Sequence, residues 1–195
     1  MRVRSRWYKK DKSASIEEIA GALAFIAWRI AKGTVTKMYN AGFNYRSNVQ
    51  QLAVIGEILI FLIQVADRLA YEELEEEDRV RFVTELARRL AGTLADNMTD
   101  EAGPGDYSGP FVERLNERAE AYAEFGFAGG EPSYPFLRYL GTCVDQLMGG
   151  QENKWVIEHV MEVEAPGAVK TLRRAFHNLL EGRKPEVDEE GGMPA

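Results

Sequence analysis

Residues 52–63 read LAVIGEILIFLI, an almost unbroken apolar stretch in a chain of 195 residues. The stretch contains no proline, and Gly56 is its one residue with a poor helix propensity. Upstream of it, Ser47 and Gln50 have the spacing of a capping box, in which the serine hydroxyl accepts a backbone N–H and the glutamine side chain reaches back. We therefore predict one long helix from Ser47 to about Glu76. A helix that is apolar nearly all round must be covered on most sides, so it should lie at the centre of a bundle.

Apolar residues recur at helical spacing on both sides of this central segment. Ser15 and Glu18 form a second capping box, and the helix after it should stop at Gly33, with a short helix following. Asp78 is the expected N-cap of the next long helix, and Pro166-Gly167 should separate two short helices. The main predicted helices cover residues 15–33, 47–76, 79–97, 110–125, 135–148, 152–163 and 166–181. The expected fold is all-α, a single-domain helical bundle of about six or seven helices.

The composition is that of a globular chain, with 45% hydrophobic and 28% charged residues. The net charge of -7 argues against nucleic acid as a partner of the whole surface. The charge is polarised, because residues 1–12 carry +5 and the remainder therefore carries -12. We expect a basic flexible arm at 1–14, an all-α domain at 15–181 and a disordered acidic tail at 182–195.

The single cysteine, Cys143, rules out an internal disulfide and favours a reducing, cytoplasmic location. An apolar run at 19–28 has the length of a secretory h-region, but Glu17 and Glu18 at its entrance argue against a signal peptide. The run at 52–63 is shorter than the about 20 apolar residues that a membrane span needs. No transmembrane segment is therefore expected.

No motif in the sequence identifies a catalytic site. The two histidines, His159 and His177, lack the glutamate three residues earlier that di-metal helical bundles use. Cys143 lies beside apolar residues, where a cysteine usually behaves as a small buried hydrophobe rather than a nucleophile. We therefore expect no catalytic residue, no metal and no cofactor, and an enzyme is the less favoured interpretation.

The central helix carries a line of polar residues. Gln50, Glu57, Gln64 and Tyr71 stand seven apart, and Asp67 lies beside them, so all share nearly one face of a helix. If this line faces the interior, Glu57, Gln64, Asp67 and Tyr71 would line a ligand pocket in which burial raises the pKa of Glu57. The favoured alternative is a solvent-facing or subunit-facing stripe, because charged groups are rarely buried without a partner.

These observations favour a non-catalytic interaction or assembly module that forms a homodimer or binds another protein. The first helix or the central stripe is the expected interface. The alternative is a small-molecule-binding protein or enzyme with a polar pocket on the central helix. A weaker alternative is nucleic-acid binding through the basic arm, where Trp7 and Tyr8 could stack on bases.

Overall fold

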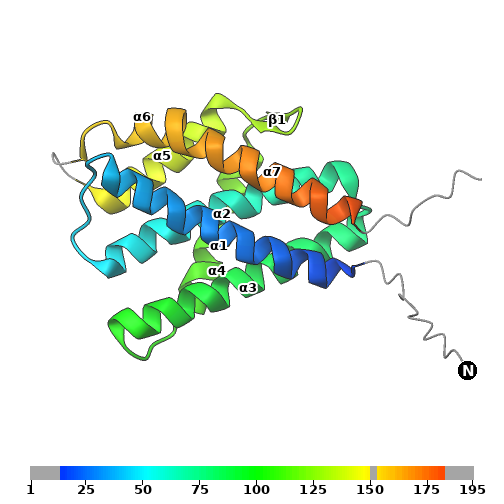
Figure 1. Ribbon diagram of the computed structural model, residues 1–195, viewed down its shortest axis with the longest axis horizontal. Helices are drawn as coiled ribbons and strands as arrows, with labels where there is room; N and C mark the ends of the chain where they lie inside the picture. Colours follow the sequence, from blue (N-terminus) through cyan, green and yellow to red (C-terminus); the bar gives the residue numbers. More distant parts are fainter. Residues whose placement is uncertain (1–13, 150–152, 183–195) are drawn as a thin grey trace, which may run out of the picture.

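The structure is a computed structural model that describes residues 14–149 and 153–182. The all-α prediction is confirmed, because six helices pack together over these residues (Figure 1). The helices are α1 (Ile16–Asn40), α2 (Asn48–Glu73), α3 (Glu76–Ala102), α4 (Ser108–Ala123), α5 (Tyr134–Met148) and one continuous segment that comprises α6 (Val156–His159), the π-helical turn η2 (Val160–Glu164) and α7 (Ala165–Glu181). Two short antiparallel strands, β1 (Phe127–Ala128) and β2 (Glu131–Pro132), join α4 to α5. Residues 1–13 and 183–195, most of the predicted arm and tail, lie outside the described residues.

The predicted central helix is α2, which packs against α1, α3, α4, α5 and α7. Its apolar residues from Val54 to Ala70 are buried on nearly every side, as its composition predicts. At its start the Ser47 hydroxyl accepts from the Gln50 N–H at 3.2 Å. The Gln50 side chain reaches back one residue further than a capping box requires, and its oxygen accepts from the Arg46 N–H at 2.6 Å. The predicted cap is therefore half formed.

The first helix, α1, begins as predicted but does not stop at Gly33. The Ser15 hydroxyl accepts from the Glu18 N–H at 3.2 Å, and the Glu18 carboxylate accepts from the Ser15 N–H at 2.7 Å. The predicted stop is wrong because the apolar face continues beyond the glycine, where Val35 and Met38 are buried in the core. This burial outweighs the cost of about 1 kcal/mol that a glycine imposes on a helix interior.

Two further predicted boundaries are also wrong. The helix α3 begins at Glu76 with Glu75 as its N-cap, whereas the Asp78 side chain accepts from Arg81 at 3.2 Å. No break occurs at Pro166-Gly167, because a π-helical turn leads directly into α7. In that turn the Ala165 N–H donates to the carbonyl of Val160, five residues earlier. The wider turn makes room for the ring of Pro166, which would clash with the preceding turn if the helix were a regular α-helix.

The helices α1 and α2 are each long and apolar enough to cross a membrane, judged by length and composition alone. In α2, 72% of the most apolar 18-residue window is buried inside the bundle, as expected for a core helix. In α1 the corresponding value is 44%, and this helix exposes two large hydrophobic side chains, Phe25 and Tyr39, among polar residues.

Candidate functional site

The predicted ligand residues on α2 do not meet in one pocket. Gln64 and Asp67 line a groove of about 290 Å³ between α2, α3 and α4. Asp67 accepts from the Arg79 Nε at 2.8 Å, so its charge is already compensated. Tyr71 lies one turn further on and is 69% exposed, with the Arg79 guanidinium 5.3 Å from its ring centroid. Glu57 does not line this groove and lies among residues of α4 and α5. Ligand binding by these four residues stays a prediction.

Glu57 is buried, with a side chain that is 3% exposed, and two arginines of α4 neutralise it. The Arg118 guanidinium donates to both carboxylate oxygens, from Nε at 3.2 Å and from Nη2 at 3.3 Å. Arg114 is more exposed and lies further away, with its Nε 3.7 Å from the carboxylate. A bidentate pair of this kind is the strongest geometry for a guanidinium and a carboxylate. Glu57 is thus a paired charge that ties α2 to α4.

The Glu57 cluster continues into α5 through Tyr139 and Cys143. The Arg118 Nη1 donates to the Tyr139 hydroxyl at 3.3 Å, and the Tyr139 ring packs edge-on against Tyr122 with centroids 5.0 Å apart. Burial raises the pKa of the Tyr122 hydroxyl well above its usual value. The sequence did not identify Arg118 as a partner of Glu57, because the two are 61 residues apart and α4 carries many charged residues. We interpret the cluster as a structural tie between three helices.

Cys143 is expected to resist alkylation in the folded protein. Burial, together with the negative charge of Glu57, raises the pKa of its thiol to about 11. Since a raised pKa leaves less thiolate at a given pH, only about one thiol in a thousand is ionised at pH 8. Iodoacetamide at pH 8 should therefore modify the native protein at least about 100-fold more slowly than the urea-unfolded protein. Mass spectrometry of timed samples measures both rates, and equal rates would contradict the buried position of this thiol.

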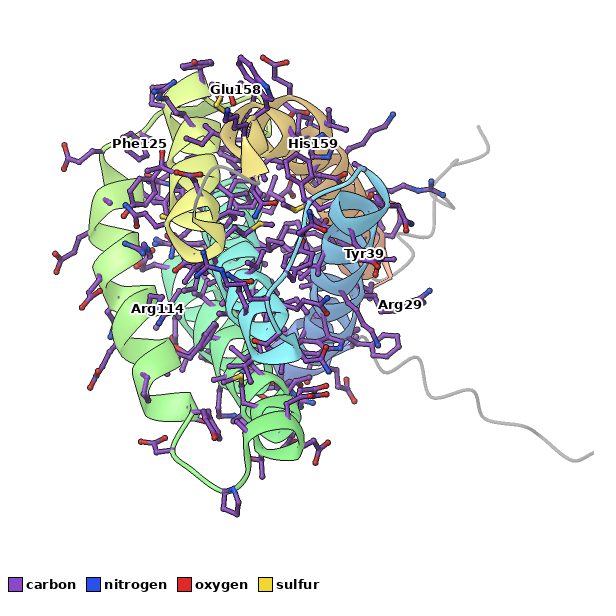
Figure 2. All side chains as sticks on the ribbon, turned by 90° about the vertical axis from the view of Figure 1, so that its left-hand side faces the viewer. Arg29, Tyr39, Arg114, Phe125, Glu158 and His159 are labelled. Carbon is purple, nitrogen blue, oxygen red and sulfur yellow. The ribbon has the colours of Figure 1, made fainter. Side chains whose placement is uncertain are left out.

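The outer face of α1 carries a stripe of exposed side chains at seven-residue spacing. The stripe consists of Glu18, Phe25, Lys32 and Tyr39. Phe25 is 63% exposed, and the guanidinium of Arg29 lies 5.8 Å from its ring centroid. Figure 2 shows Arg29 and Tyr39 on the same flank of the bundle. The sequence placed the first helix among the possible interfaces, but it could not separate this outer stripe from the buried face of the helix.

A groove of about 440 Å³ runs beside Phe25, between α1 and α3. On the α1 side it is lined by Gly21, Ala24 and Trp28. On the α3 side it is lined by the small residue Gly92 and by the charged side chains of Arg88, Arg89 and Asp96.

No family model, curated protein or solved structure matches the chain. The α1 face and the Glu57 cluster are therefore interpreted from their own geometry.

Proposed function

We propose that this protein is a cytoplasmic assembly module that acts as a homodimer joined through the outer face of α1. The observation that carries the proposal is the symmetry of the exposed stripe about Phe25. Glu18 and Lys32 lie seven residues before and after this ring, and they carry opposite charges. An interface formed by a two-fold axis must be complementary to itself, and this stripe meets that condition.

An antiparallel pair of α1 helices, with the two-fold axis at Phe25, brings Lys32 of each copy opposite Glu18 of the other. Both residues lie about 10 Å along the helix axis from Phe25, because an α-helix rises 1.5 Å per residue. The Glu18 carboxylate accepts from the Ser15 N–H through one oxygen, and its other oxygen can accept from a lysine. Two symmetry-related ion pairs would therefore flank the central rings.

The central rings of this arrangement supply most of the affinity. Phe25 of one copy can enter the groove beside Phe25 of the other, where Trp28 and Ala24 provide apolar contacts on one side and the Arg88 and Arg89 side chains line the other. Fully burying a phenylalanine side chain contributes about 1.5–3 kcal/mol, and the dimer contains two of them. The exposed ion pairs contribute about 0–1 kcal/mol each and chiefly set the antiparallel orientation.

Sedimentation equilibrium of the full chain and its variants tests this proposal. The wild type is expected to be a dimer at micromolar concentration, and Phe25→Asp is expected to be a monomer. Lys32→Glu places like charges opposite each other at two symmetry-related positions. It should therefore raise the dissociation constant of the dimer about tenfold or more. The double variant Glu18→Lys, Lys32→Glu restores opposite charges and should regain most of the affinity. Because Glu18→Lys also removes half of the α1 cap, thermal melts are recorded for each variant.

Lys37→Glu is the matched control, because it makes the same charge change on α1 beside the groove that faces α7. This variant should dimerise like the wild type. A wild-type chain that stays monomeric at all concentrations would overturn the proposal. So would a Lys37→Glu variant that weakens the dimer as much as Lys32→Glu does, since the effect would then reflect net charge rather than the stripe.

A further inference from the structure

A separate groove of about 390 Å³ lies between α1 and α7, which pack side by side (Figure 1). Residues between Ile26 and Lys37 line it on the α1 side, and residues between Gly167 and Thr171 line it on the α7 side. Its volume is within the range of about 300–1,000 Å³ that is usual for small-molecule sites. The groove beside Phe25 lies between α1 and α3 instead, so the proposed dimer contact does not account for this second groove.

The middle of the α1 wall is Gly33, a glycine in the interior of a long helix. No atom outside its own helix lies within 4 Å of where its Cβ would be, so no contact of the fold requires a glycine here. Gly167, on the opposite wall, is equally open. Glycine is common where the backbone closely approaches a ligand. The open space above Gly33 is therefore the centre of a candidate binding site.

Two cations flank this space. Arg29 and Lys37 stand four residues before and after Gly33, so each lies about 6 Å from the glycine along the helix axis and on nearly the same face. Both line the groove, both are exposed, and neither forms an ion pair with another described residue. Arg29 contacts the face of the Phe25 ring, which leaves its N–H donors without an acceptor in the described part of the chain. An anion above Gly33 would be within reach of both side chains.

The walls of the groove belong to two basic segments of the domain. Residues 19–56 contain four lysines and arginines and residues 165–180 contain three, and neither segment contains an aspartate or a glutamate. None of the residues that line the groove is acidic. The chain as a whole carries a net charge of -7, so this concentration of positive charge is opposite in sign to the protein. Such a distribution of charge attracts anions to the groove.

Thr34 supplies a neutral donor to the same groove. The residue is only 5% exposed and lines the groove, and its hydroxyl forms no hydrogen bond with another described residue. The Thr171 hydroxyl, on the opposite wall, shows the usual alternative in a helix, because it donates to the Gly167 carbonyl at 2.9 Å. Most polar groups this far from solvent have a partner in the protein. The Thr34 hydroxyl is therefore available to a ligand.

We propose that this groove binds a small phosphate monoester. The phosphate would lie above Gly33, where Arg29, Lys37 and the Thr34 hydroxyl can donate to its terminal oxygens. A phosphate monoester carries a charge of about -1.5 to -2 at neutral pH, which matches two cations better than a carboxylate or a sulfate ester does. The apolar residues that line the rest of the groove would pack on the body of the molecule. The proposal does not depend on dimerisation, because every lining residue belongs to one chain.

Phenyl phosphate is the probe, and phenyl sulfate is its monoanionic control of the same shape. Both are titrated into the full chain at pH 7.5 by isothermal titration calorimetry. Phenyl phosphate is expected to bind at one site per chain, at least tenfold more tightly than phenyl sulfate. Phosphatidic acid carries the same monoester on a lipid. Competition by vesicles that contain it would assign the natural monoester to a membrane lipid, and absence of competition would assign it to a soluble molecule.

Lys37→Glu and Lys32→Glu form a matched pair of variants. Both make the same charge change on α1, but only Lys37 lines the groove. Lys37→Glu should lower the affinity for phenyl phosphate at least tenfold, whereas Lys32→Glu should change it less than threefold. The order is reversed in sedimentation equilibrium, where Lys32→Glu weakens the dimer and Lys37→Glu does not. Failure of this proposal can therefore be distinguished from failure of the dimer.

Gly33→Leu separates binding from stability. The leucine side chain fills the space above the helix and should abolish phenyl phosphate binding, while the Tm is kept or raised because leucine favours a helix more than glycine does. Thr34→Val removes the hydroxyl at nearly constant side-chain size and should weaken binding at least threefold. The proposal is overturned by equal affinities for the two probes, by the absence of saturable binding at millimolar concentrations, by equal effects of Lys37→Glu and Lys32→Glu, or by binding that persists in Gly33→Leu.

Discussion

Replacing Arg118 with alanine is expected to lower the free energy of unfolding by about 3 kcal/mol. The variant removes the guanidinium that donates to both oxygens of the buried Glu57 carboxylate. Without Arg118, the desolvation of the buried Glu57 charge is no longer compensated. Breaking the pair therefore costs more stability than the pair contributed. Urea unfolding followed by circular dichroism measures the change, provided that the slope of the transition is unchanged.

Arg114→Ala is the matched control for this experiment. Arg114 approaches the same carboxylate at 3.7 Å but is more exposed, so its removal should cost less than about 1 kcal/mol. The double variant Glu57→Leu, Arg118→Met replaces the pair by apolar side chains and should recover most of the lost stability. Equal losses for Arg114→Ala and Arg118→Ala would show that the bidentate contact is not the main partner of Glu57.

Gly141→Ala is expected to destabilise the fold by about 2–3 kcal/mol. A Cβ at this position of α5 would lie 2.9 Å from the carbonyl oxygen of Ile157 and 3.2 Å from its Cα. Both are backbone atoms, so α6 would have to move away from α5 rather than turn aside a flexible side chain. Thermal and urea unfolding measure the loss, and the displacement of α6 should also change the NMR signals of His159.

Gly33→Ala provides the comparison, since it makes the same substitution inside another helix. No atom outside its own helix lies within 4 Å of the Cβ that it would add. It should stabilise the protein by about 0.5–1 kcal/mol, because alanine loses less conformational entropy than glycine in a helix. If both variants stabilised the protein, helix propensity would outweigh the close approach of α5 and α6 at Gly141.

The sequence predicted the fold class and the central helix, because hydrophobic periodicity and capping residues act over one or two turns. The errors at Gly33 and at Pro166-Gly167 arose where distant contacts override such local signals. Gly33 continues the helix because Met38 is buried by other elements, and Pro166 is accommodated by a turn of a different width. No local pattern in the sequence indicates either effect.

The candidate sites were predicted only in part. The first helix was one of the interfaces that the sequence predicted, but the stripe from Glu18 to Tyr39 was identified only from the exposed side chains of the structure. The partner of Glu57 could not be found in this way, because Arg118 is one of several arginines on charged helix surfaces. The contact of the His159 imidazole with the buried Glu164 carboxylate likewise depends on the π-helical turn, which no sequence pattern indicated.

The π-helical turn between α6 and α7 also determines where the chain can change in length. It holds one more residue than an α-helical turn, because the Ala165 N–H bonds to the carbonyl of Val160. One residue removed between Val160 and Glu164 would let the backbone return to a regular α-helix, and the later residues would keep their orientation about the helix axis. One residue removed between Val169 and Leu172 would instead rotate every later residue by about 100°, since an α-helix has 3.6 residues per turn. Phe176, now fully buried, would then turn away from the core, so α7 tolerates a deletion far less well than the turn before it.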